Sequence, residues 1–202
     1  MSITYVEANL IEVINMIIAK RQSNTGYQNG KVYVAQGCNC FAAMGAGFAA
    51  QVARNYPMAA AVDENYAKYF VTPEDKEKNQ LGTYSVAHIG GGVVMFNLYS
   101  QLYGGPDFRL EAFERAFDEM MLTIEEAVET DEVNALVLMP RIGAGIGGGK
   151  WEEISKIIEQ YQGAADFMIY DYKPTVIVSS WRNQYHDDHD VSRYMIEDVE
   201  QD

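Results

Sequence analysis

The chain has 202 residues, of which 48% are hydrophobic and 5 are proline, and this composition favours one folded domain over a disordered chain. Its 29 acidic residues outnumber 15 Lys and Arg, and the formal net charge of −14 disfavours binding to nucleic acid or to an anionic membrane surface. The two cysteines, Cys38 and Cys40, are separated by one residue, which predicts reduced thiols and a cytoplasmic protein. We expect no signal peptide and no membrane-spanning segment.

Strand-like and helix-like segments alternate along the chain. Strands are expected at 3–6, 31–36, 82–88, 93–99, 135–139 and 166–172, with an edge strand at 175–178. Helices are expected after Asn9, at 48–54, at 59–70, from Asp107 to Val128 and at 151–162. The three glycines at 90–92 predict a hairpin, so the sheet is mixed. The pattern predicts an α/β domain over 1–181, with helices on both faces of one sheet.

Two charged segments are interpreted as solvent-exposed. Residues 74–78 alternate acidic and basic side chains, which is typical of a solvated surface. Residues 182–202 are acidic and poor in apolar side chains, so they are interpreted as a loose C-terminal tail. His186–Asp190 within this tail has the composition of a metal site, but solvated surface is the preferred interpretation. No metal ion and no cofactor is expected.

Two glycine-rich turns are the most informative feature, and each follows an apolar strand-like run. The first covers 37–47 (GCNCFAAMGAG) and the second covers 140–149 (PRIGAGIGGG). Glycine lets a ligand approach the backbone closely, and a turn at a helix start directs free N–H groups at an anion. Both turns are expected beyond the carboxyl ends of strands, where α/β sheets bind ligands. The pair therefore predicts a phosphate-bearing ligand held from two sides.

Other glycine-loop chemistries fit less well. Residues 143–148 satisfy G-x-G-x-x-G and Asp171 lies near the acidic position of that dinucleotide motif, but only about fifty residues follow. A P-loop would need glycine in place of Ala144 and Ser or Thr in place of Trp151. No G-x-S-x-G elbow of an α/β-hydrolase occurs. Glycines that only permit tight turns would explain either turn singly, but the pair poorly.

Several short motifs also occur in an order typical of one family. They are the segments 3–10 (ITYVEANL), 38–49, 55–57, 81–82, 97–101 (NLYSQ), 103–105, 139–146 (MPRIGAGI), Trp151 and 167–170. On these motifs, residues 1 to about 172 resemble the macrodomains, specifically the branch of ADP-ribose-1''-phosphate phosphatases and related ADP-ribosyl hydrolases. The resemblance implies a three-layer α/β/α fold with a mixed central sheet that binds ADP-ribose in a cleft.

The resemblance also implies roles for individual residues. Asn9 would face the adenine amino group, Leu10 would offer a backbone amide, and Tyr170 would lie near the adenine. The second glycine turn would hold the diphosphate through its amides, and Asn39 with the first turn would surround the distal ribose. The full expected ligand-binding set is Asn9, Leu10, Cys38, Asn39, Met44, Gly45, Ala46, Gly47, Ile142, Gly143, Ala144, Gly145, Ile146, Gly147 and Tyr170. Asn9 is equally a good helix cap, and Tyr170 equally a packed strand residue.

The chemistry at the distal ribose stays open. Hydrolytic relatives place a His, an acid or a Lys where this chain has Gln36, Gly147 and Gln101, and a glutamine amide accepts no proton near neutral pH. The hypothesis assigns catalysis to Asn39, Gln101 and Asp107, with water oriented by Asn39 or by a nearby acid.

Several of these residues have alternative interpretations. Asp107 also suits the N-cap of the long helix. His88 ends a strand and could reach the cleft, but a structural role is preferred. Cys38 could be an activated nucleophile, but it lacks a basic neighbour in the sequence.

Two functions of different class remain. The preferred one is an enzyme that dephosphorylates ADP-ribose 1''-phosphate or hydrolyses a related ADP-ribosyl linkage. The alternative is a binding module for ADP-ribose or a related nucleotide signal. The expected partner is thus a small nucleotide, and the sequence does not indicate an oligomeric state.

Overall fold

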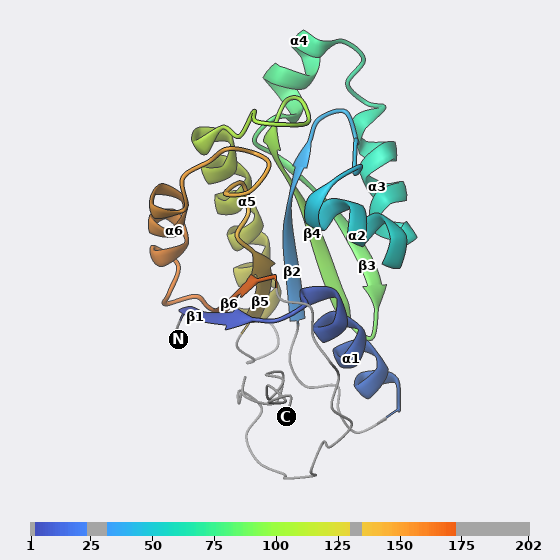
Figure 1. Ribbon diagram of the computed structural model, residues 1–202, viewed down its shortest axis with the longest axis vertical. Helices are drawn as coiled ribbons and strands as arrows, with labels where there is room; N and C mark the ends of the chain where they lie inside the picture. The colour runs from blue at the N-terminus through green and yellow to red at the C-terminus, as the bar shows by residue number, and fades with distance from the viewer. Residues whose placement is uncertain (1–2, 24–31, 130–134, 173–202) are drawn as a thin grey trace, which may run out of the picture.

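The computed structural model describes residues 3–23, 32–129 and 135–172, which form a six-stranded sheet between two layers of helices (Figure 1). The strands are β1 (Ile3–Glu7), β2 (Val32–Asn39), β3 (Tyr84–Gly90), β4 (Val93–Gln101), β5 (Ala135–Pro140) and β6 (Ala165–Asp171). Their order is β1-β6-β5-β2-β4-β3, and the described pairings are parallel except that of β3 with β4. The mixed three-layer α/β/α fold and the hairpin expected from the sequence are confirmed.

The helices cover both faces of this sheet. They are α1 (Leu10–Ser23), α2 (Gly47–Asn55), α3 (Pro57–Ala67), α4 (Pro73–Asp75), α5 (Leu110–Glu129) and α6 (Trp151–Glu159), with one π-helical turn, η1 (Lys76–Gln80). Helices α1, α2 and α3 share one apolar cluster with the sheet, and α5 and α6 share the other. Figure 1 shows α5 and α6 together on the side opposite α1, α2 and α3.

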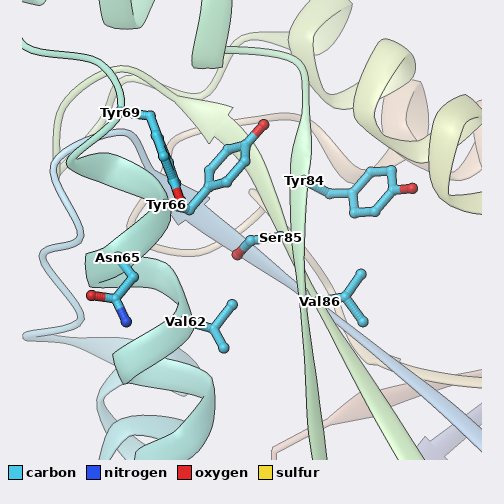
Figure 2. Close-up of a pocket in the computed structure, with 7 residues that line it drawn as sticks. All are labelled: Val62, Asn65, Tyr66, Tyr69, Tyr84, Ser85 and Val86. Carbon is cyan, nitrogen blue, oxygen red and sulfur yellow. The ribbon is translucent and has the colours of Figure 1, made fainter.

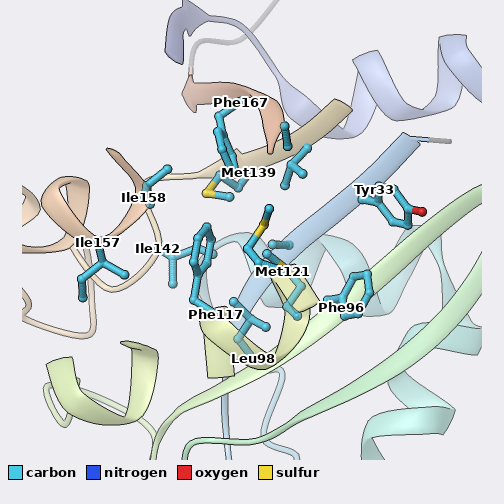
Figure 3. Close-up of a cluster of buried hydrophobic side chains, with 14 of the residues drawn as sticks. Tyr33, Phe96, Leu98, Phe117, Met121, Met139, Ile142, Ile157, Ile158 and Phe167 are labelled. Atoms are coloured by element: carbon cyan, nitrogen blue, oxygen red, sulfur yellow. The ribbon is translucent and has the colours of Figure 1, made fainter. Parts of the chain in front are cut away.

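Successive residues of the central strands enter opposite clusters. Val137 and Met139 of β5 face α5 and α6, whereas Leu138 between them faces α1. This alternation follows from the two-residue period of a strand. Both faces are covered, so these strands are almost continuously apolar. Figure 3 shows the α5–α6 side, where Phe117 projects toward the sheet near Phe167.

Some element bounds differ from the expected ones. The strand expected at 31–36 continues to Asn39, and the long helix begins at Leu110 rather than Asp107. The Asp107 carboxylate accepts hydrogen bonds from the backbone amides of Leu102 and Tyr103, at 3.0 and 2.9 Å, so it stabilises a turn before the helix. The N-cap role expected for Asp107 is therefore wrong.

The expectation that residues 74–78 are solvated holds for Glu74, Glu77 and Lys78 but is wrong for Lys76. This segment lies in α4 and η1, and Lys76 is only 6% exposed. The Lys76 ammonium donates to the carbonyl of Ala67 at the end of α3 and to Gln80 Oε1, at 2.7 and 3.3 Å. A buried lysine is tolerated here because its charge meets the carbonyl end of a helix.

Some expectations lie outside the described residues. These are the edge strand at 175–178, the tail at 182–202 and the His186–Asp190 segment. Within the described ranges, no helix combines the length and the apolar character that a transmembrane span requires.

Replacing Phe117 tests the α5–α6 core. Phe117 is fully buried and its ring lies 5.3 Å from that of Phe113, between centroids. We expect Phe117→Ala to lower the free energy of unfolding by about 4 kcal/mol, measured by chemical denaturation, because it leaves a cavity. Leu122→Ala in the same helix is the control, since Leu122 is 59% exposed and should cost little. Equal losses for both variants would contradict this view of the core.

Candidate functional site

The two glycine-rich turns border one cleft. β2 and β5 are parallel neighbours, with Val34 opposite Leu138, so their carboxyl ends lie at the same edge of the sheet. Each turn starts where its strand ends, and a cleft of about 540 Å³ is lined by both of them. The shared groove that the sequence interpretation requires is therefore present.

Most residues expected at the site line this cleft. They are Cys38, Asn39, Met44, Gly45, Ala46, Gly47, Gln101, Ile142, Gly143, Ala144, Gly145, Ile146, Gly147 and Tyr170. Asn9, Leu10 and Asp107 are not among the described lining residues. Asn9 Oδ1 accepts from the amide of Ile11 at 3.1 Å, which caps the first turn of α1, and Leu10 is buried. Ligand contacts of Asn9 and Leu10, and catalysis by Asp107, stay predictions.

The first turn presents a run of unused amides to the cleft. Within the described part of the chain, the backbone N–H groups of Gly45, Ala46 and Gly47 donate to no acceptor. Gly47 is the first residue of the nine-residue helix α2, so the positive end of the helix dipole also lies at the cleft. Such an arrangement attracts an anion.

The second turn presents a matching run from the other side. The amides of Gly145, Ile146 and Gly147 likewise donate to no acceptor in the described ranges. The turn itself is closed by Gly149, whose amide donates to the Gly143 carbonyl at 2.9 Å. Its shape is therefore held by its own backbone, which leaves the middle of the loop free to bind.

Two glycines of the cleft have room for a side chain. A Cβ built on Gly45 or Gly145 meets no atom within 4 Å. Neither residue has the positive φ that favours glycine. By contrast, a Cβ on Gly147 would lie 2.9 Å from the Gly143 carbonyl oxygen. Packing thus explains Gly147, whereas at Gly45 and Gly145 a side chain would only fill the cleft.

Two curated proteins resemble the chain, and no family model matches it. An uncharacterized 17.5 kDa protein from the tk-vs intergenic region of Enterobacteria phage T4 is 34% identical over 147 residues, 70% of this chain and 86% of that protein. An ADP-ribose 1''-phosphate phosphatase of Lodderomyces elongisporus is 25% identical over 145 residues, 69% of this chain and 86% of that one.

Solved structures with the same fold include named macrodomains. A protein of unknown function from Bacteroides thetaiotaomicron has a TM-score of 0.62 and 21% identity over 84% of this chain and 98% of that one. The macrodomain of Thermus aquaticus DarG has a TM-score of 0.60 and 18% identity, over 84% of this chain and 98% of that one. A macrodomain protein from Streptomyces coelicolor has a TM-score of 0.57 and 22% identity, over 85% of this chain and 100% of that one. The chain has the macrodomain fold.

The structure contradicts the dinucleotide-binding alternative. In the described ranges only α6 and β6 follow the second turn, and β6 inserts between β1 and β5. Asp171, which matched the acidic position of that motif, instead accepts two hydrogen bonds from the Arg141 guanidinium, at 2.5 and 2.7 Å.

Arg141 is the one cation among the described residues that line the cleft. Its guanidinium lies 5.2 Å from the ring centroids of both Tyr5 and Trp151, in addition to its pairing with Asp171. Such a bidentate pair neutralises much of the charge and fixes the side chain. Arg141 therefore ties β5 to β1, β6 and α6 at this end of the cleft.

The Asn39 side chain shapes the first turn. Its Oδ1 accepts from the amides of Phe41 and Ala43 at 3.1 and 3.2 Å, and its Nδ2 donates to the Ala43 carbonyl at 3.1 Å. Phe41 then stacks on Tyr103 at 5.2 Å between centroids, and the Lys76 ammonium lies over Phe41. These contacts join the loops after β2 and β4. Contact of Asn39 with a ribose stays a prediction.

Neither Cys38 nor His88 offers catalytic chemistry. Burial raises the pKa of Cys38 well above its usual value, and the nearby Asp63 carboxylate raises it further, so the thiol stays protonated. His88 is exposed on β3 and does not line the cleft. The structure therefore gives no support to an activated nucleophile at Cys38. Among the described residues, no cluster of three or more His, Cys, Asp or Glu side chains is placed to hold a metal ion.

One acidic residue of the cleft was missed from the sequence. Asp63 of α3 lines the cleft although it is 1% exposed. Tyr99 of β4 donates to Asp63 Oδ1 at 2.8 Å, whereas Oδ2 has no hydrogen-bond partner within the described ranges. Burial raises the pKa of Asp63 to about 6, against the smaller lowering effect of the Tyr99 hydrogen bond.

A separate hollow of about 390 Å³ lies between α3 and β3 (Figure 2). Apolar and aromatic side chains such as Val62, Tyr66 and Tyr84 line it, and none of the residues expected at the site belongs to it. The hollow is therefore distinct from the cleft at the strand ends.

The raised pKa of Asp63 predicts a pH dependence of stability. In the unfolded chain the carboxyl ionises near 3.8 and in the folded protein near 6, so between these values the folded state binds more protons. Stability should therefore fall as pH rises from about 4 to 6, by up to about 3 kcal/mol. In Asp63→Asn this loss should disappear, measured as the difference in unfolding free energy at each pH.

Glu64→Gln is the control for this measurement. Glu64 is the exposed neighbour of Asp63 and contributes less to its shift than burial does. The variant should retain most of the pH dependence. The assignment to Asp63 fails if Asp63→Asn and the wild type lose stability in parallel.

Proposed function

We propose that this macrodomain binds ADP-ribose in the cleft and removes phosphate from ADP-ribose 1''-phosphate, or hydrolyses a related ADP-ribosyl linkage. The observation that carries the proposal is the pair of unused amide runs, at 45–47 and 145–147, on opposite sides of one cleft. Their spacing along two neighbouring turns suits a ligand with adjacent phosphates. A structural neighbour, DarTG of Thermosipho africanus, was solved in complex with ADP-ribose.

The amides also explain how so acidic a protein would bind an anion. The chain carries a formal charge of −14, and the Arg141 charge is already paired with Asp171. Backbone N–H dipoles and the α2 dipole supply local positive potential without any net charge. The phosphates would thus be held by short-range hydrogen bonds rather than by a cationic field.

The hydrolytic part of the proposal draws on the resemblance to the phosphatase of Lodderomyces elongisporus and on the carboxylate of Asp63 inside the cleft. One observation favours a binding module instead: Gln101 Nε2 donates to the Gly105 carbonyl at 2.6 Å, so this side chain serves the loop rather than chemistry. A cytoplasmic location and the absence of nucleic-acid and membrane partners stay predictions.

Replacing Gly145 tests the binding site. Gly145→Val should weaken ADP-ribose binding by roughly 30-fold or more, because the new side chain occupies the space of the phosphate oxygens. Its thermal stability should change little, since nothing lies within 4 Å of the added Cβ. Gly163→Val is the matched control, because Gly163 is equally uncrowded but lies outside the cleft. Calorimetric affinity of Gly145→Val equal to that of the control would remove the second turn from the site.

A direct assay separates the two functions. We expect the purified protein to release inorganic phosphate from ADP-ribose 1''-phosphate above the uncatalysed rate, and to bind ADP-ribose in calorimetry. Binding without release would favour the binding module. If the protein shows no binding of ADP-ribose and no release of phosphate, the proposal as a whole is refuted.

A further inference from the structure

Two buried side-chain oxygens of the cleft have no hydrogen-bond partner among the described residues. They are Oε1 of Gln36 on β2 and Oδ2 of Asp63 on α3, and both residues are 1% exposed. Both residues line the cleft. A buried acceptor without a donor destabilises the fold, so this pair calls for a ligand group that donates hydrogen bonds.

A chain of buried hydrogen bonds fixes the orientation of both groups. Gln36 Nε2 donates to Asn97 Oδ1 at 2.8 Å, and Asn97 Nδ2 donates to Ser85 Oγ and to the Ala59 carbonyl, at 3.1 and 3.2 Å. Ser85 Oγ lies 3.0 Å from the Tyr99 hydroxyl, which donates to Asp63. Because the two Asn97 donors are committed, its oxygen must face Gln36, and the Gln36 oxygen is left for the cleft.

The surroundings of these hydrogen-bonded side chains also determine which of the groups ionises near neutral pH. The groups that act electrostatically on the Asp63 carboxylate are Tyr99 of β4, Cys38 of β2, Cys40 just after β2, Lys76 of η1 and Glu64 of α3. Burial raises the pKa values of Tyr99, Cys38 and Cys40, so none of the three competes for ionisation near neutral pH. Lys76 supplies the opposite charge from across the end of α3. Asp63 is therefore the group of this set that changes its protonation near pH 6.

We propose that Asp63 accepts the proton of the hydrolytic water, and that Gln36 positions this water as its second hydrogen-bond acceptor. The proposal rests on the hydrolase function proposed above. A water molecule has two O–H donors, and the cleft offers two buried acceptors without a donor in the described ranges. Asp63 also supplies a base, which Gln36, Gly147 and Gln101 cannot provide at the positions where hydrolytic relatives have one.

The reaction balances without any co-reactant. The water oxygen forms a bond to phosphorus while Asp63 Oδ2 takes one water proton. The bond between phosphorus and the ribose O1'' breaks, and its electron pair stays on O1''. That oxygen then takes the proton back from Asp63. The products are ADP-ribose and inorganic phosphate, and Asp63 is again ionised.

The test measures phosphate release from ADP-ribose 1''-phosphate as a function of pH, with ADP-ribose affinity measured by calorimetry. We expect kcat of the wild type to rise with pH through a midpoint near 6. In Asp63→Asn kcat should fall by about 100-fold or more and lose this midpoint, while ADP-ribose affinity stays within about threefold. Glu64→Gln is the control and should keep the wild-type rate.

A second variant covers the case in which Asp63→Asn folds poorly. Tyr99→Phe keeps the ring but removes the hydrogen bond that lowers the pKa of Asp63, so its kcat midpoint should shift to higher pH. If the wild type turns over and Asp63→Asn keeps the same rate, or if the kcat midpoint of Tyr99→Phe does not shift, the role of Asp63 is overturned while the hydrolase function stands. If the wild-type protein binds ADP-ribose but releases no phosphate, the hydrolase function is overturned, and this inference with it.

Discussion

The parallel pairing of β2 with β5 determines the arrangement of the whole site. Parallel neighbours end at the same edge of a sheet, so the loops that follow them must lie side by side. One loop enters α2 directly, and the other returns through α6 to β6. Each loop presents three consecutive amides without a protein acceptor in the described ranges. An antiparallel pairing would place them at opposite edges, and no shared cleft would form.

Beneath this cleft, the sheet face under α3 is unusually polar. Gln36, Asn97, Ser85 and Tyr99 form a row of hydrogen-bonded side chains, and Asp63 of α3 ends this row. Most of their donors and acceptors are paired, so the row is stable in a buried environment. The exceptions are Gln36 Oε1 and Asp63 Oδ2, which belong to residues that line the cleft. A carboxylate held in this way keeps a fixed position and a raised pKa, which ordinary surface acids lack.

Sequence reasoning reached the fold and the cleft because both depend on local patterns. The alternation of apolar runs and the glycine turns at 37–47 and 140–149 are visible without any tertiary information. Asp63 was missed because its segment carries no motif that distinguishes it from any other helix, and its partner Tyr99 is 36 residues away along the chain. The burial of Lys76 was missed for a similar reason. A run of alternating charges is typical of a solvent-exposed segment, and Lys76 is buried only because η1 packs against the end of α3.

The pairing of Arg141 with Asp171 has a consequence for the response to ionic strength. With that cation neutralised, an incoming anion experiences attraction from dipoles at close range and repulsion from the acidic molecule at long range. Added salt shortens the reach of the repulsion to about 8–10 Å but hardly weakens hydrogen bonds inside a cleft. Affinity for a nucleotide diphosphate should then tighten as salt is added, opposite to the behaviour of sites built from lysine and arginine clusters.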